Sequence, residues 1–124
     1  ALDLTTSYPT WSPDGRSIAF QATRDDGTRH IWIVDLATRR ARPLTSGAGE
    51  DSHPYWSPTD ADRIAFVRNH ENLMTVRVSD GRVEALTHFA EPNMVVDYPS
   101  WSADGTKIDF SIARKRGDLY LLER

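Results

Sequence analysis

The sequence has no cysteine, which excludes disulfide staples and thiol chemistry but does not choose between cytosol and periplasm. It also has no apolar run approaching the ~18 residues that a transmembrane helix needs, and it does not open on a charged and then apolar leader. We therefore expect no membrane partner. We also expect the chain to be soluble and unprocessed, or a trimmed piece of a longer protein.

An excess of basic residues is missing as well. The 15 lysines and arginines are scattered among 18 acidic residues, and the formal net charge is −3. A surface that binds the phosphate backbone needs a concentration of positive charge, so we expect no nucleic-acid partner. Hydrophobic residues make up 39% of the 124 positions, which is enough for the packed core of one ordinary domain.

Three tryptophans carry the same motif, in which a proline lies two residues before and a serine directly after. They are Trp11, Trp56 and Trp101, and each lies 45 residues from the next. Two of the three copies continue into Asp-Gly, a dipeptide that accepts the positive φ of a tight hairpin. A repeat of this length with a tryptophan motif is typical of a propeller blade, which is a sheet of four strands.

Strand and turn signals divide the chain into blades. The first blade covers residues 8–45, the second covers 53–87, and residues 98–124 supply the first three strands of a third. Residues 1–5 end in Leu-Thr, as do the outer strands of both complete blades, so we expect them to form an outer strand that complements the last blade. Residues 31–34 are apolar on both faces, which predicts a strand covered on both sides.

These signals predict an all-β fold, a β-propeller with three four-stranded blades per chain. Known propellers have about four to eight blades, and three cannot close a ring. Two copies joined head to tail as a homodimer would complete a six-bladed ring, with residues 1–5 of one chain completing the last blade of the other in trans. The alternative is a fragment of a larger propeller.

The repeated Tyr-Pro-x-Trp-Ser-Pro-Asp-Gly stretch, with Ile-Trp-Ile-Val-Asp-Leu at residues 31–36 and the outer Leu-Thr, resembles the WD-like repeat of TolB-type β-propellers. Ala103 departs from the pattern by replacing a proline, and Asp109 by replacing the alanine found at positions 19 and 65. The resemblance implies a scaffold that binds another protein or a peptide, periplasmic if the TolB role carries over. Because related propellers are gating domains of hydrolases, the alternative is a regulatory or gating portion of a larger hydrolase or kinase.

No residue pattern indicates catalysis or a cofactor. The string from Gly15 to Ala19 lacks the second glycine of a hydrolase nucleophile elbow and falls inside a strand. The four histidines, His30, His53, His70 and His88, stand singly and show no metal-ligand spacing. We therefore expect a non-enzymatic protein with no catalytic residue, no metal site and no cofactor.

The repeat assigns roles to two sets of residues. Aromatic side chains at equivalent places are expected to form the core between blades, and these are Trp11, Trp56, Trp101, Phe20, Phe66 and Phe110. Loops at one end of the blades are expected to gather polar side chains around a channel mouth, a usual binding surface. This rim comprises Arg24, Asp26, Arg29, Asp51, His53, His70, Glu71, Arg114 and Arg116. The alternative is that these side chains only keep the loops soluble.

Overall fold

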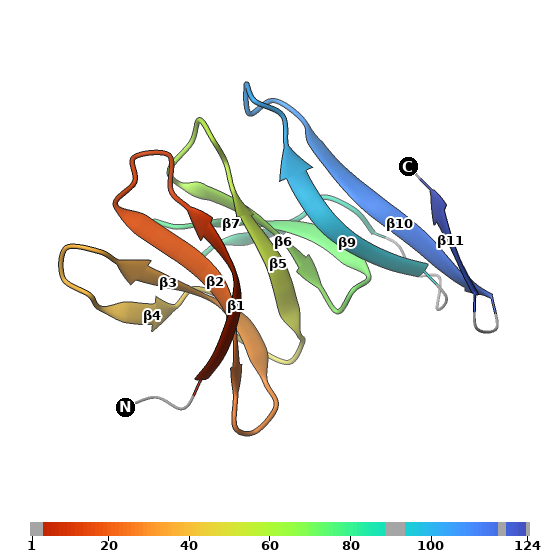
Figure 1. The fold of residues 1–124 in the computed structure, drawn as a ribbon, viewed down its shortest axis with the longest axis horizontal. Helices are drawn as coiled ribbons and strands as arrows, with labels where there is room; N and C mark the ends of the chain where they lie inside the picture. Colours follow the sequence, from red (N-terminus) through yellow and green to blue (C-terminus); the bar gives the residue numbers. More distant parts are fainter. Residues whose placement is uncertain (1–3, 89–93, 117–118, 124) are drawn as a thin grey trace.

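The computed structural model describes residues 4–88, 94–116 and 119–123, which form three antiparallel sheets (Figure 1). The first sheet contains β1 (Leu4–Trp11), β2 (Ser17–Arg24), β3 (Arg29–Asp35) and β4 (Ala41–Pro43). The second contains β5 (Asp51–Trp56), β6 (Arg63–Arg68), β7 (Asn72–Arg77) and β8 (Val83–Ala85), and the third contains β9 (Met94–Trp101), β10 (Ile108–Arg116) and β11 (Leu119–Glu123). The prediction of an all-β fold built from antiparallel sheets is confirmed.

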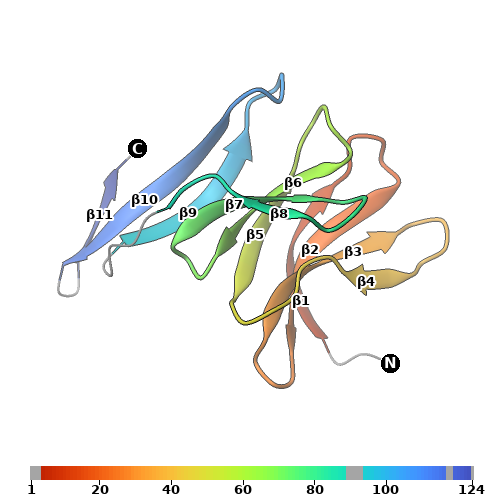
Figure 2. The ribbon, with the colours of Figure 1, turned by 180° about the vertical axis from the view of Figure 1, so that it is seen from behind.

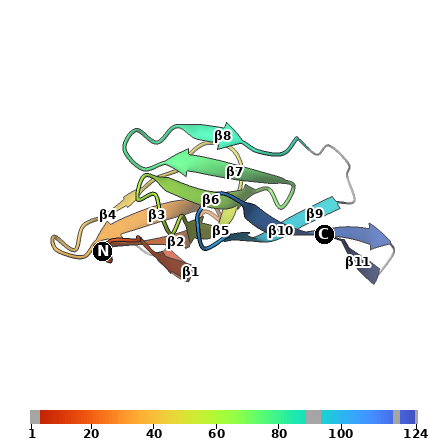
Figure 3. The same cartoon turned by 90° about the horizontal axis from the view of Figure 1, so that it is seen from above.

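The three sheets are arranged as an arc, with their first strands β1, β5 and β9 side by side (Figure 1). In the second sheet, β6 and β7 separate β5 from β8, which lies at the far edge when the molecule is seen from above (Figure 3). Seen from behind, β3 and β4 lie at one end of the arc and β10 and β11 at the other (Figure 2). The described residues contain no helix long and apolar enough to cross a bilayer.

The hydrophobic core lies between neighbouring sheets rather than within one. Between the first and second sheets, Trp56, Ile64 and Phe66 pack with Ala19 and Ile31 in one cluster. Between the second and third, Trp101 packs with Ala65 and Leu73, and half-buried Ile108 and Phe110 lie against them. Trp56 and Trp101 therefore each cover the face of the blade that precedes them.

The packing of Trp56 and Trp101 on a preceding blade explains why the prediction that Trp11 belongs to the core is wrong. Trp56 and Trp101 are 3% and 9% exposed, but Trp11 is 60% exposed. Trp11 lies on the first sheet, and none of the described sheets packs against its ring as the first two sheets pack against Trp56 and Trp101. Among the phenylalanines, Phe66 is fully buried and Phe20 is half-buried.

The predicted outer strand at residues 1–5 must also be corrected. Leu4 and Thr5 belong to β1 and pair with Arg24 and Thr23 of β2, whereas residues 1–3 lie outside the described part. The strand continues through a register shift between Ser7 and Thr10. Pro9 lies at this shift, and for that reason the sequence predicted that the strand begins at Tyr8. The same shift occurs in the other two blades, so β5 and β9 also begin before residues 53 and 98. Leu4 and Thr5 are therefore already paired within their own blade.

The turns after the tryptophans offer a matched pair of glycines. Gly15 and Gly105 have φ of +71° and +73°, a conformation that suits glycine. A Cβ at Gly15 would meet nothing, but at Gly105 it would clash with the hydroxyl of Thr59, which lies in the corresponding turn of the second blade. Both Gly→Ala changes are expected to destabilise the fold, and Gly105→Ala should lower the free energy of unfolding by about 1 kcal/mol more. Urea unfolding of both variants measures this difference.

The control is Thr59→Ala introduced into the Gly105→Ala protein, where removal of the Thr59 hydroxyl and methyl should recover part of the added loss. Equal losses of stability for Gly15→Ala and Gly105→Ala would show that the turn of Gly105 does not contact the turn of Thr59 in the second blade.

Candidate functional site

Three rings at equivalent places of the repeat form a row in which the outer two rings are exposed and the middle ring is half-buried. Tyr8, His53 and Tyr98 lie in β1, β5 and β9, each directly before a proline and each at the register shift of its strand. The ring centroids of Tyr8 and His53 are 4.5 Å apart, and those of His53 and Tyr98 are 5.0 Å apart. We call these three residues the aromatic row.

The backbone of the aromatic row is unusual. The φ angles of Tyr8, His53 and Tyr98 are 54°, 53° and 56°. A residue before proline normally takes an extended backbone, and a positive φ costs a residue other than glycine roughly 1–2 kcal/mol. The chain therefore holds three bulky rings in a conformation that glycine would adopt without strain.

The middle residue of the row, His53, is held through its backbone by the neighbouring blade and through its ring by its own blade. The backbone N–H of His53 donates to Oε1 of Gln21 in β2 at 3.0 Å, and its Nδ1 lies 3.1 Å from Oγ of Ser52. The His70 ring, from the turn between β6 and β7, lies edge-on with its centroid 6.3 Å from that of His53. The outer two rings are more open, since Tyr8 is 47% and Tyr98 is 63% exposed.

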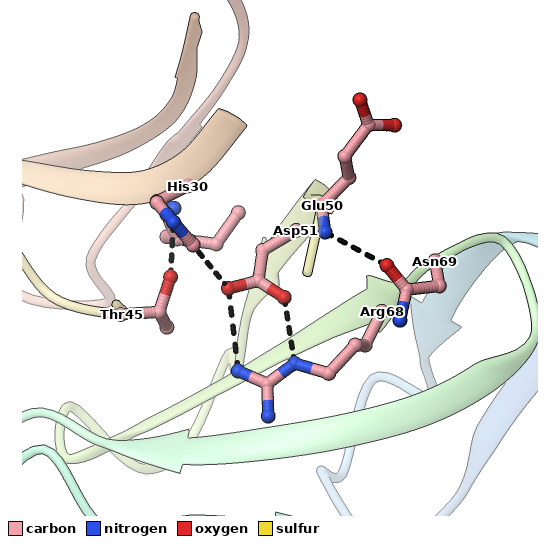
Figure 4. A network of polar contacts seen from close by, with 7 residues as sticks. His30, Thr45, Glu50, Asp51, Arg68 and Asn69 are labelled. Atoms are coloured by element: carbon pink, nitrogen blue, oxygen red, sulfur yellow. Dashed lines mark hydrogen bonds and ion pairs between the residues drawn. The ribbon is translucent and has the colours of Figure 1, made fainter. Parts of the chain in front are cut away.

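A polar cluster, separate from the aromatic row, lies between the first and second blades (Figure 4). Asp51, at the start of β5, is fully buried and lies between His30 of β3 and Arg68 of β6. The Arg68 Nε donates to Oδ1 of Asp51 at 2.8 Å and its Nη2 to Oδ2 at 3.3 Å, while Nδ1 of His30 lies 2.9 Å from Oδ2. A carboxylate enclosed in this way joins two blades and has no room for a substrate.

The remaining predicted rim residues are dispersed. The Arg24 guanidinium lies 5.1 Å from the centre of the Trp32 ring, and the Arg29 Nε donates to Oγ1 of Thr23 at 3.2 Å. Glu71 is exposed in the β6–β7 turn. The side chains of Arg114 and Arg116 lie outside the described residues. Of the predicted rim, the structure brings the rings of His53 and His70 together, and within the described residues no three metal-ligand side chains converge.

Asp26 belongs to a set of carboxylates that close hairpin turns. Its Oδ1 accepts hydrogen bonds from the N–H and hydroxyl of Thr28 at 2.9 Å and 2.7 Å, and these bonds lower its pKa. In the third blade, hydrogen bonds from the hydroxyls of Ser102 and Thr106 and from the N–H of Thr106 lower the pKa of Asp104 to about 2. These carboxylates are charged at neutral pH because they cap their own loops, which is a structural role.

Sequence reasoning missed the two tyrosines of the row and the partners of Asp51. The signal for the row was present, because an aromatic ring precedes the motif proline in all three repeats. No comparable signal marks His30 and Arg68, which lie 21 and 17 residues from Asp51 and face it only after the blades pack.

Comparison with known proteins agrees with this architecture. The family model of the TolB beta propeller domain matches residues 2–122. The Tol-Pal system protein TolB of Alcanivorax borkumensis is 40% identical over 63 residues, which cover 51% of this chain and 14% of that protein. A probable dipeptidyl-aminopeptidase B of Penicillium rubens is 32% identical over 103 residues, covering 77% of this chain and 11% of that protein.

A solved structure of TolB from Acinetobacter baumannii is similar over nearly the whole chain. The TM-score is 0.70 and the identity is 25%, with 98% of this chain and 29% of that chain covered. The chain thus spans less than a third of the length of each of these proteins. The tryptophan repeat, the three packed antiparallel sheets and the family match over residues 2–122 lead to one conclusion, that this chain belongs to the TolB β-propeller domain family.

Proposed function

We propose that this chain is part of a non-enzymatic β-propeller scaffold that binds a partner protein at the aromatic row. The observation that carries this proposal is the repetition of a strained ring at the same place in each blade, with the two outer rings exposed. Hydrophobic packing does not require an exposed ring, and rings with a polar edge are common in protein interfaces. The similarity to TolB supports the same conclusion and a periplasmic location.

The absence of catalysis is part of the proposal and rests on the burial of Ser52 and Asp51. Ser52 lies beside the His53 imidazole, as a nucleophile lies beside its base, but Ser52 is only 1% exposed. Asp51 is fully buried and already engaged by His30 and Arg68. Neither group can reach a substrate without opening the interface between the blades.

The test compares the wild-type chain with Tyr8→Gly/Tyr98→Gly as bait in extracts of the source organism, with captured proteins quantified by mass spectrometry. Glycine suits the positive φ at both positions, so the double variant should keep its fold. We expect one or more proteins to be captured by the wild-type chain and lost with the double variant.

The matched control is Tyr55→Ala, which removes a 42% exposed tyrosine from β5 without touching the row. Proteins that bind the row should be captured equally by the control and the wild-type chain. Capture that is identical for wild type and the double variant, or absent from both, would contradict the proposed binding role.

A second candidate is a regulatory or gating portion of a larger hydrolase or kinase. The observation that favours the hydrolase form is the similarity to dipeptidyl-aminopeptidase B, which covers 77% of this chain. In that case the parent gene should encode a catalytic domain beside this segment, and the aromatic row should contribute to substrate entry rather than to partner binding.

The proposal includes completion of a ring by further blades at the Trp11 face. A second copy could supply them and give a six-bladed homodimer. Its two chains would join through contact between blade faces and not through residues 1–5 in trans, because Leu4 and Thr5 are already paired in β1. One residue opposes this closure, since Asp109 would bring a carboxylate to the place that Ala19 and Ala65 occupy in the interfaces within the chain. An unpaired carboxylate is costly to bury. A blade that carries a small residue at the position equivalent to Asp109 would therefore pack against the Trp11 face with less loss of stability than the third blade of a second copy.

A further inference from the structure

The aromatic row has three properties that together narrow the kind of ligand it can hold. It is formed of rings with polar edges, it crosses three strands, and it lies where those strands depart from regular pairing. Its outer members are about half exposed or more. The irregular pairing argues against a ligand that adds as a β-strand, and the spacing and polar edges of the rings favour a ligand recognised by side chains.

A partner cannot add itself as a regular β-strand at this place. The strands β1, β5 and β9 are each at the end of a sheet, so their outer edges could in principle pair with an extended peptide. Pro9, Pro54 and Pro99 directly follow the row and have no N–H to donate, and the register shifts interrupt the ladder at the same residues. Recognition at the row must therefore use the side chains.

The dimensions of the row fit one turn of a polyproline II helix. The two centroid steps of 4.5 Å and 5.0 Å place the outer rings at most about 9.5 Å apart. A polyproline II helix has three residues per turn and rises about 3.1 Å per residue, so one turn is about 9.3 Å long. The outer rings of Tyr8 and Tyr98 can therefore contact residues that lie about one turn apart.

The hydrogen-bonding chemistry fits as well. A polyproline II segment makes no internal hydrogen bonds, and its proline residues offer carbonyl oxygens without N–H groups. The phenol groups of Tyr8 and Tyr98 can donate to such carbonyls, while the ring faces pack against pyrrolidine rings. The segment is also stiff before it binds, so little conformational entropy is lost.

We propose that the aromatic row binds a proline-containing segment of a partner protein in the polyproline II conformation. This inference rests on the proposed function, because it names the ligand of the same surface. Tyr8 and Tyr98 act as the two outer contacts, and His53 supplies the middle ring, its backbone N–H bonded to Gln21 of the neighbouring blade.

The experiment uses a fluorescently labelled nonaproline peptide and measures anisotropy with the purified chain. Nonaproline should bind the wild-type chain and bind Tyr8→Gly/Tyr98→Gly at least about tenfold more weakly, because two aromatic contacts are lost. Binding to Tyr55→Ala should equal that of the wild type. Aromatic NMR signals of Tyr8 and Tyr98 should shift on titration, which places the peptide on the row rather than elsewhere.

Two further probes separate the alternatives. A nine-residue peptide of alternating glycine and serine tests for binding of any flexible chain, and cellohexaose tests for stacking of sugar rings. We expect neither to bind comparably to nonaproline. Equal binding of the glycine-serine peptide, binding of cellohexaose alone, or no binding of nonaproline would each overturn the polyproline assignment.

Failure of the inference and failure of the proposed function give different results. If proteins are captured in a row-dependent way but nonaproline neither binds nor displaces them, the ligand class is wrong and the scaffold role stands. If nonaproline binds equally to the wild type and to the double glycine variant, the row is not its site and the inference is wrong.

Discussion

Replacing Trp56 by alanine is expected to lower the free energy of unfolding by about 3–5 kcal/mol, while the same change at Trp11 lowers it by less than about 1 kcal/mol. The two residues occupy the same place in the repeat, but Trp56 is 3% exposed and Trp11 is 60% exposed. Removal of the Trp56 ring leaves a cavity between the first and second blades, lined by Ala19 and Ile31 among others. Removal of the Trp11 ring leaves no cavity.

Trp101→Ala should resemble Trp56→Ala, because Trp101 is 9% exposed and its Nε1 donates to the Tyr55 carbonyl oxygen of the preceding blade at 2.8 Å. Urea unfolding, followed by circular dichroism so that loss of tryptophan does not change the signal, measures all three variants. A large loss for Trp11→Ala would mean that another surface covers this ring in solution. Light scattering would then show whether that surface is a second copy, since the mass would be twice 14.0 kDa and would fall in the variant.

Asp51→Ala is expected to cost about 3–5 kcal/mol, because it removes the acceptor that engages both Arg68 and His30. The side chain of Asp51 is fully buried and those of His30 and Arg68 are 12% and 29% exposed, so water can replace only part of the lost contacts. Since His30 belongs to the first blade and Arg68 to the second, the change should also loosen one blade from the other. Thermal unfolding should then become broader as well as earlier, as expected when repeats uncouple.

Asp109→Ala is the matched control, since it removes a carboxylate that is exposed on the third blade. Its effect on unfolding of the isolated chain should stay within about 0.5 kcal/mol. If Asp51→Ala proved equally mild, the contacts to His30 and Arg68 would not be holding the first two blades together.

Short-range patterns in the sequence were enough to predict the blades. The 45-residue spacing of Trp11, Trp56 and Trp101, the Asp-Gly turns and the alternating strands follow local rules, so the antiparallel sheets could be read from them. Strand beginnings were less accurate. The prolines after Tyr8 and His53 mark irregular pairing inside a strand, and the sequence does not distinguish this from the start of one.

The sequence by itself determined the repeat, the all-β class and the identity of the residues at each repeated place, because these depend on neighbours along the chain. The exposure of Trp11 and the burial of Trp56 were decided only by tertiary structure, since burial depends on whether another blade lies against the ring. The same holds for the three-residue cluster around Asp51 and for the aromatic row. Their members are far apart in sequence, and only the side-by-side packing of β1, β5 and β9 brings the rings into contact.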